Sequence, residues 1–154
     1  MKARFVGLSF GILWLLVGAS AAGVAAGIAI ACAGLVVFTM AILRIRRQPE
    51  RQSRPFIRAY YMCSVAAEVA AIIAAQLWLA AHAREDLLWP AVGLIVGLHF
   101  IGLWLASSDR RYLWLTGAMV ALNVGALLLP ISTRERIMMS GFGSSACLLV
   151  SALS

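Results

Sequence analysis

The chain has 154 residues, of which 63% are hydrophobic and 12% charged, and its formal net charge is +7. Soluble domains carry roughly 45–50% apolar and about 25% charged residues, so this chain has more apolar side chains than a water-soluble core of its length can bury. Lipid is therefore the expected solvent for most of it. The basic side chains stand in short runs beside apolar stretches, which is typical of membrane topology signals and headgroup contacts and argues against nucleic-acid binding.

Six apolar segments follow one another, and each is predicted to be a transmembrane helix. A spanning helix needs about 20 residues at about 1.5 Å of rise each. The first apolar run, Phe5 to Leu43, is nearly twice that length, and the small residues at 18–23 are its expected turn. The predicted helices span residues 5–19, 23–43, 56–81, 89–106, 112–129 and 137–154. Residues 1–154 are thus predicted to be a single all-α transmembrane domain.

Polar segments separate these helices and predict their orientation. If the N-terminus is inside, the inner segments hold most of the basic side chains, and the outer loops hold a few that stand beside acidic residues. The inner set is Lys2, Arg4, Arg44, Arg46, Arg47, Arg51, Arg54, Arg58, Arg110 and Arg111, and the outer set is Arg84, Arg134 and Arg136, beside Glu85, Asp86 and Glu135. This asymmetry predicts an integral membrane protein with both termini in the cytoplasm.

The N-terminal segment has a second interpretation. Lys2 and Arg4, an apolar stretch and then Ala19-Ser20-Ala21 are also the pattern of a secretory signal peptide with a small-residue cleavage site. Cleavage would leave five helices and an outer N-terminus, so the two interpretations predict different topologies.

A polar cluster is predicted in the middle of the membrane. Glu68 lies about 18 Å from the inner end of its helix and His99 about 15 Å from the outer end of the next one, at about 1.5 Å per residue. In a hydrocarbon core about 30 Å thick, both sit near the midplane. Asn123 in the following helix reaches a similar depth, and Gln76 lies toward the outside on about the same face as Glu68. Glu68 and His99 can therefore meet, and Asn123 can orient either of them.

These four residues, Glu68, His99, Asn123 and Gln76, are the candidate ligand- or ion-binding residues. Ionisable side chains are costly in hydrocarbon and usually mark function or pair with a partner. Glu68 and His99 can bind a proton, hold a cation or act as acid and base, so they are also the candidate catalytic residues. The structural alternative is a clasp, because polar side chains hold membrane helices together by hydrogen bonds.

Three function classes remain open. One is a small proton- or cation-coupled transporter that uses the Glu68–His99 pair; another is a structural or accessory membrane subunit in which the cluster is a clasp; the third is an intramembrane acid–base enzyme on a lipid-like substrate. The chain holds no Walker loop, HExxH, GxSxG or dinucleotide fingerprint. We expect no cofactor and no metal, membrane lipids as partners, and a small molecule or ion as the ligand. A homo-oligomer also remains open.

One local pattern resembles a known group. Gly97-Leu98-His99-Phe100, with Leu105-Ala106 and a charged turn after it, is similar to a motif of small, uncharacterised bacterial multi-pass proteins. The preceding segment Ala66-Ala67-Glu68-Val69-Ala70 is similar to theirs as well, although the group often has proline where Gly102 stands here. The resemblance implies a bacterial inner-membrane location and no established activity.

Overall fold

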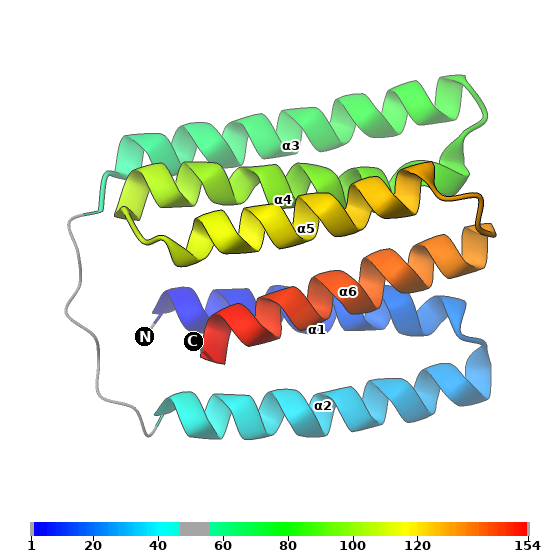
Figure 1. Cartoon of the computed structure of the whole chain (residues 1–154), viewed down its shortest axis with the longest axis horizontal. Coiled ribbons are helices and arrows are strands. Elements are labelled where there is room, and N and C mark those ends of the chain that lie inside the picture. The colour runs from blue at the N-terminus through cyan, green and yellow to red at the C-terminus, as the bar shows by residue number, and fades with distance from the viewer. Residues whose placement is uncertain (1, 47–55, 154) are drawn as a thin grey trace.

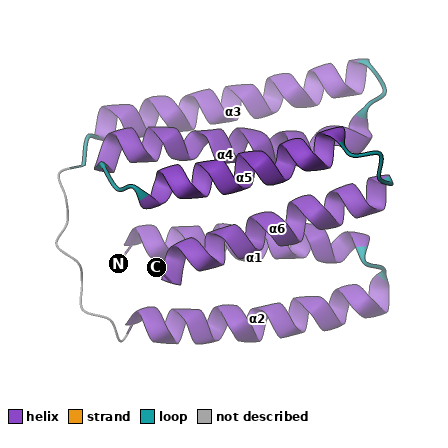
Figure 2. Cartoon of the chain, viewed as in Figure 1, coloured by secondary structure: helices purple, strands orange, loops and turns teal. Residues whose placement is uncertain are grey.

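The computed structural model describes residues 2–46 and 56–153, which form a helical bundle without strands (Figure 2). In chain order the elements are α1 (Lys2–Ala21), α2 (Val24–Arg46), α3 (Arg58–Ala81), the short 3-10 helix η1 (Glu85–Leu87), α4 (Leu88–Ser107), α5 (Arg111–Leu128) and α6 (Thr133–Leu153). The predicted six-helix, all-α fold is confirmed. Most of the predicted inner loop, with Arg47, Arg51 and Arg54, lies outside the described residues.

The largest error in the predicted boundaries is at α6, which was expected to begin at residue 137 and begins at Thr133. Ser132 and Glu135 form a capping box that starts the helix earlier. The Ser132 backbone N–H donates to Glu135 Oε2 at 2.8 Å, and the Glu135 N–H donates to Ser132 Oγ at 3.3 Å. The polar residues that looked like a loop are therefore the first turn of a helix. The end of α2 was also placed too early, because the helix continues to Arg46.

The helices lie side by side, with α2 and α3 at opposite edges of the bundle and α1, α4, α5 and α6 between them (Figure 1). α3 makes its extensive helix contacts with α4, whereas α4 also packs against α5 and α6. The start of α3 and the end of α4 are joined by a hydrogen bond from the Ile57 N–H to the Ala106 carbonyl at 2.8 Å. α3 is thus an edge helix with one main neighbour.

Close helix contacts in the centre depend on small residues. A Cβ added at Gly141 of α6 would collide with the backbone of Gly18 in α1, and one added at Gly27 of α2 would collide with the Ala19 carbonyl. Gly23 has a φ of +89° in the turn between α1 and α2, a conformation that favours glycine. The predicted turn at residues 18–23 is therefore confirmed, with the turn itself at its C-terminal end.

α1 contributes directly to the core of the bundle. Its Leu8 and Trp14 side chains are 1% and 2% exposed, and the Trp14 ring meets Trp89 of α4 edge-on at 6.4 Å. In this structure α1 therefore packs as one of the six helices. Under the signal-peptide interpretation, cleavage would remove these side chains and leave α4 and α6 with an open face.

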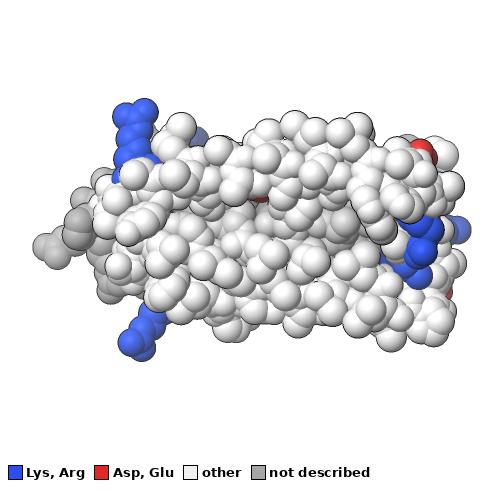
Figure 3. Space-filling model, turned by 90° about the horizontal axis from the view of Figure 1, so that it is seen from above, with Lys and Arg blue, Asp and Glu red and all other residues white. Residues whose placement is uncertain are grey.

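The distribution of charge fits a membrane protein. Five segments, Val24–Arg46, Arg58–Ala81, Glu85–Ser107, Arg111–Leu128 and Thr133–Leu153, are long and apolar enough to cross a bilayer, and α1 adds the shorter apolar stretch Val6–Ala21. Lys and Arg side chains lie at the two ends of the face seen in Figure 3 and not along its middle. The start of α1 and the end of α6 lie at the same end of the bundle (Figure 1), as six helices in alternating directions require.

Candidate functional site

The site begins with one face of α3. Tyr61, Ser64 and Glu68 follow one another at helical spacing and are all half-buried, whereas their neighbours Met62, Cys63 and Val69 are exposed. This is the face that packs on α4. The main neighbour of α3 is α4, and His99 of α4 lies opposite these polar residues.

Glu68 and His99 are in direct contact. His99 Nδ1 lies 3.2 Å from Glu68 Oε2, and the two side chains are 9% and 17% exposed, respectively. The expected contact between these two residues is therefore present. Two antiparallel helices joined by a short turn lie side by side, so residues at the same distance from the turn come close together. A small area of acidic atoms, set back among side chains that carry no Lys, Arg, Asp or Glu charge, is visible midway along the molecule in Figure 3.

Ser64 is a third member of the site that the sequence analysis missed. Its hydroxyl lies 2.9 Å from His99 Nδ1 and 3.0 Å from the His99 backbone carbonyl, to which it donates a hydrogen bond. The available signal was its position four residues before Glu68, which places both side chains on the same helix face. Serine is common in membrane helices, so its type alone did not single it out.

Aromatic rings enclose the His99 imidazole. Tyr61 of α3 meets it edge-on with ring centroids 6.5 Å apart, and Phe100 lies edge-on at 5.9 Å. Phe100 in turn stacks on Tyr112 of α5 at 6.2 Å, with the planes only 7° apart. These rings fix the orientation of the imidazole and limit access of water to it, and the site thereby extends from α3 to α5.

Asn123 does not join the pair, contrary to expectation. Its side chain is completely buried and faces α6, where its Oδ1 accepts from Ser140 Oγ at 2.6 Å and its Nδ2 donates to Ser144 Oγ at 3.3 Å and to the Met119 carbonyl at 2.9 Å. Gly93 of α4 leaves the space for it, since a Cβ there would collide with the Asn123 amide. Gly93 lies six residues, about 9 Å along α4, from His99, so Asn123 differs from the pair in its level along the bundle as well as in the direction of its side chain.

Gln76 is exposed on α3 and lines no path to Glu68. Eight residues at 3.6 per turn put it about 80° around the helix from Glu68, so the expectation that the two share a face was wrong. The residues that do continue the Glu68 face toward the C-terminal end of α3 are Ala75, which is half-buried, and Leu79, which is buried.

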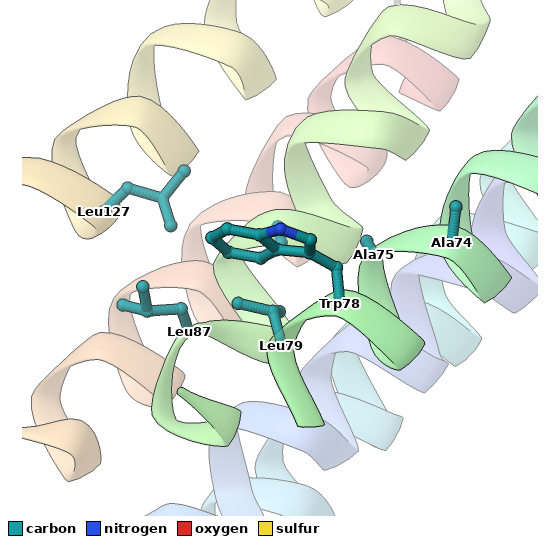
Figure 4. A pocket seen from close by; sticks show the side chains of 7 residues that line it. Ala74, Ala75, Trp78, Leu79, Leu87 and Leu127 are labelled. Carbon is teal, nitrogen blue, oxygen red and sulfur yellow. The ribbon is translucent and has the colours of Figure 1, made fainter. Parts of the chain in front are cut away.

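These two residues border a groove between α3, α4 and α5. It has a volume of about 490 Å³, and its lining consists of apolar side chains, namely Ala74, Ala75, Trp78, Leu79, Leu87, Ala91 and Leu127. Figure 4 shows the Trp78 ring among Leu79, Leu87 and Leu127. Neither Glu68 nor His99 lines the groove, which ends toward Ala75, about 10 Å along the helix from Glu68 at 1.5 Å per residue.

The chemistry of the pair follows from its composition. A carboxylate and an imidazolium, or a carboxylic acid and a neutral imidazole, share one proton at zero net charge, so the pair can hold a proton in hydrocarbon without an uncompensated charge. Removing that proton leaves a net negative site that attracts a proton or another cation. Among the described residues no three His, Cys, Asp or Glu side chains gather in one place.

Comparison with known proteins adds no family to this picture. No family model, curated protein or solved structure matches the chain. The resemblance to small bacterial multi-pass proteins therefore stays a prediction from a short motif, and the function has to be argued from the geometry alone.

Proposed function

We propose that the chain is a small multi-pass membrane transporter in which the Glu68–His99 pair binds and releases the proton that is coupled to passage of a small molecule or cation. The observation that carries this proposal is the 3.2 Å contact between an acid and a base midway along two apolar helices, with the His99 side chain 9% and the Glu68 side chain 17% exposed. An isolated charge in hydrocarbon is costly. The pair has no net charge whether the shared proton lies on Glu68 or on His99, so it can hold a proton without that cost and release it later.

The position of α3 supports the same proposal. Transport requires that a site open alternately to the two sides, which is usually a movement of one part of the bundle against the rest. α3 is an edge helix that carries Glu68 and packs mainly on α4, so a movement of α3 changes the site while α1, α4, α5 and α6 stay together. The apolar groove on the outer side of Glu68 provides space along the same interface.

The proposed orientation places both termini in the cytoplasm. At the end that holds the termini, the described basic side chains include Arg44, Arg46, Arg58 and Arg110, whereas the basic side chains at the opposite end are matched by acidic ones. Basic excess marks the cytoplasmic side. With the motif resemblance, this supports a bacterial inner membrane as the location.

Carbodiimide labelling tests whether Glu68 takes up a proton. Dicyclohexylcarbodiimide reacts with protonated carboxyl groups in apolar surroundings, and mass spectrometry locates the adduct. We expect pH-dependent labelling of Glu68 in the purified protein, no adduct at this position in Glu68→Gln, and unchanged labelling in Glu85→Gln, because Glu85 is an exposed carboxyl at the end of the bundle. Absence of labelling at every pH in folded protein would overturn the proposal.

Proton movement across proteoliposomes tests whether protons pass through the Glu68 site. With a pH-sensitive dye inside and a potassium diffusion potential imposed by valinomycin, wild-type vesicles should take up protons faster than protein-free vesicles. Glu68→Gln should reduce the rate to that of the protein-free vesicles and Glu85→Gln should not. Equal rates in wild type and Glu68→Gln, or in wild-type and protein-free vesicles, contradict the proposal.

A structural clasp is the second candidate, favoured by the contacts of Ser64. His99 Nδ1 has two polar partners on α3, as a clasp between α3 and α4 requires, and the Asn123–Ser140–Ser144 cluster shows that this bundle uses such clasps elsewhere. In that role the protein is an accessory subunit, and replacement of Glu68 weakens folding without any effect on proton movement. An acid–base enzyme has less support, since the groove that could hold a substrate is lined by neither Glu68 nor His99.

A further inference from the structure

His99 Nδ1 has two candidate partners on α3. Ser64 Oγ lies 2.9 Å away and Glu68 Oε2 lies 3.2 Å away. A ring nitrogen carries either one hydrogen or one lone pair, so full hydrogen bonds to both partners are alternatives. The Ser64 hydroxyl also has a second acceptor within reach, the His99 carbonyl at 3.0 Å. The hydroxyl hydrogen can therefore point at the carbonyl or at Nδ1 by rotation about one bond.

We infer that Ser64 is a positioning residue that takes over His99 Nδ1 when Glu68 accepts the proton, and so stabilises the protonated carboxyl as a free acid. This inference rests on the proposed function and adds to it the group that makes the proton transfer reversible. It gives the pair two arrangements of equal net charge, which differ only in where one proton lies.

In the first arrangement the ring is an imidazolium with a hydrogen on each nitrogen. Nδ1–H donates to the Glu68 carboxylate, and the Ser64 hydroxyl donates to the His99 carbonyl. In the second, the Nδ1–H bond has broken and an O–H bond has formed at Glu68 Oε2, which leaves a neutral ring with its hydrogen on Nε2. The lone pair now on Nδ1 accepts the Ser64 hydroxyl hydrogen, and the carboxylic acid is released from the ring.

The surroundings make a substitute partner necessary. The His99 side chain is only 9% exposed and is enclosed by Tyr61 and Phe100, so water cannot readily replace Glu68 at Nδ1. The titratable groups that face the ring are Tyr61 and Glu68 from α3, with Tyr112 of α5 behind Phe100. Gly102 holds α4 against Ser64 so closely that a Cβ there would meet the Ser64 side chain, which keeps the hydroxyl at bonding distance.

The tautomer of His99 tests this directly. Protein with ¹⁵N-labelled histidine in detergent micelles, with His82→Gln so that one ring remains, shows by ¹⁵N chemical shifts which nitrogen holds the hydrogen. In wild type we expect the neutral Nε2–H tautomer of the second arrangement, and we expect Ser64→Ala to shift the ring from this tautomer toward the imidazolium, which carries a hydrogen on both nitrogens, because the second arrangement has lost its partner at Nδ1. Ser107→Ala is the matched control, since the Ser107 hydroxyl bonds to the Leu103 carbonyl of its own helix.

Ser64→Cys separates hydrogen bonding from packing. Cysteine fills nearly the same space but is a weak donor, so a hydrogen-bonding role predicts a tautomer balance like that of Ser64→Ala, together with a several-fold slower carbodiimide reaction of Glu68 in both variants. A packing role predicts that Cys behaves like Ser. That result, or an unchanged tautomer in Ser64→Ala, overturns the inference. The tautomer measurement does not depend on transport. If the transport proposal alone fails, proton movement is the same with and without Glu68, while Ser64→Ala still shifts the tautomer.

Discussion

Gly102 of α4 lies directly against Ser64 of α3, and a Cβ at position 102 would collide with both the Cβ and the hydroxyl of that serine. This contact sets the spacing of the two helices about one turn from the Glu68–His99 pair. A glycine in the middle of a helix costs roughly 0.5–1 kcal/mol relative to alanine. Here it gives α3 and α4 the closeness that the polar contact needs.

Gly102→Ala should therefore weaken the α3–α4 contact despite the gain in helix propensity. Overpacking costs about 1–3 kcal/mol, against a gain of about 1 kcal/mol for alanine, so we expect a net loss of up to about 2 kcal/mol. Unfolding in SDS titration measures it. The matched control is Gly117→Ala in α5, where an added Cβ meets nothing within 4 Å and stability should stay the same or rise. Equal behaviour of the two variants would show that the close contact has no energetic importance.

The Glu68–His99 contact should appear as coupling between the two positions. Removal of one partner leaves the other polar group in an apolar interface, so Glu68→Gln and His99→Gln should each destabilise, while the double variant should cost less than their sum. We expect a coupling energy of about 0.5–3 kcal/mol in a double-mutant cycle measured by SDS unfolding. Additive effects within error would mean that the two side chains do not interact in the folded protein.

The Asn123 cluster is predicted to be independent of the Glu68 site. Asn123→Ala leaves the hydroxyls of Ser140 and Ser144 without their buried partner, and since membrane hydrogen bonds average about 0.6 kcal/mol and reach about 1.7, we expect a loss of about 1–2 kcal/mol. Carbodiimide labelling of Glu68 in the same variant should match wild type. A changed pH dependence of labelling would show that the two clusters are coupled after all.

The fold was predictable from the sequence because hydrophobic length and arginine placement are set by the bilayer and require no knowledge of partners. Helix ends were less predictable where a polar first turn looked like a loop, as at Thr133. In the site, depth brought Glu68 and His99 together, since consecutive antiparallel helices must be neighbours. Rotation about the helix axis was missing for both Asn123 and Gln76, and for Asn123 the level along the bundle was misjudged as well.

The position of a residue around its helix axis decides which neighbouring helix its side chain faces, as Asn123 and Gln76 show. Gly93 and His99 lie six residues apart on α4, about 120° around the helix from one another, so one faces Asn123 of α5 and the other faces α3. Nothing in a single sequence states which neighbour each face meets. Ser64 was missed for a different reason. The sequence places it on the same helix face as Glu68, but only the structure shows that its hydroxyl lies within hydrogen-bonding distance of His99.

The last prediction concerns orientation, which the charge distribution implies and the helix count constrains. A C-terminal green fluorescent protein fusion should fluoresce in a bacterial host, and a C-terminal alkaline phosphatase fusion should be inactive, because the first folds in the cytoplasm and the second only outside it. A phosphatase fusion truncated after Ala83, in the turn between α3 and η1, should be active.

If α1 were removed as a signal peptide, the five remaining helices would still place the C-terminus inside but the new N-terminus outside. An N-terminal epitope tag that stays on the mature protein and is inaccessible in intact spheroplasts supports six crossings; loss of the tag by processing supports five. Active phosphatase at the C-terminus contradicts the predicted orientation in either case, and the basic excess at the end of the bundle that holds both termini would then need an explanation other than topology.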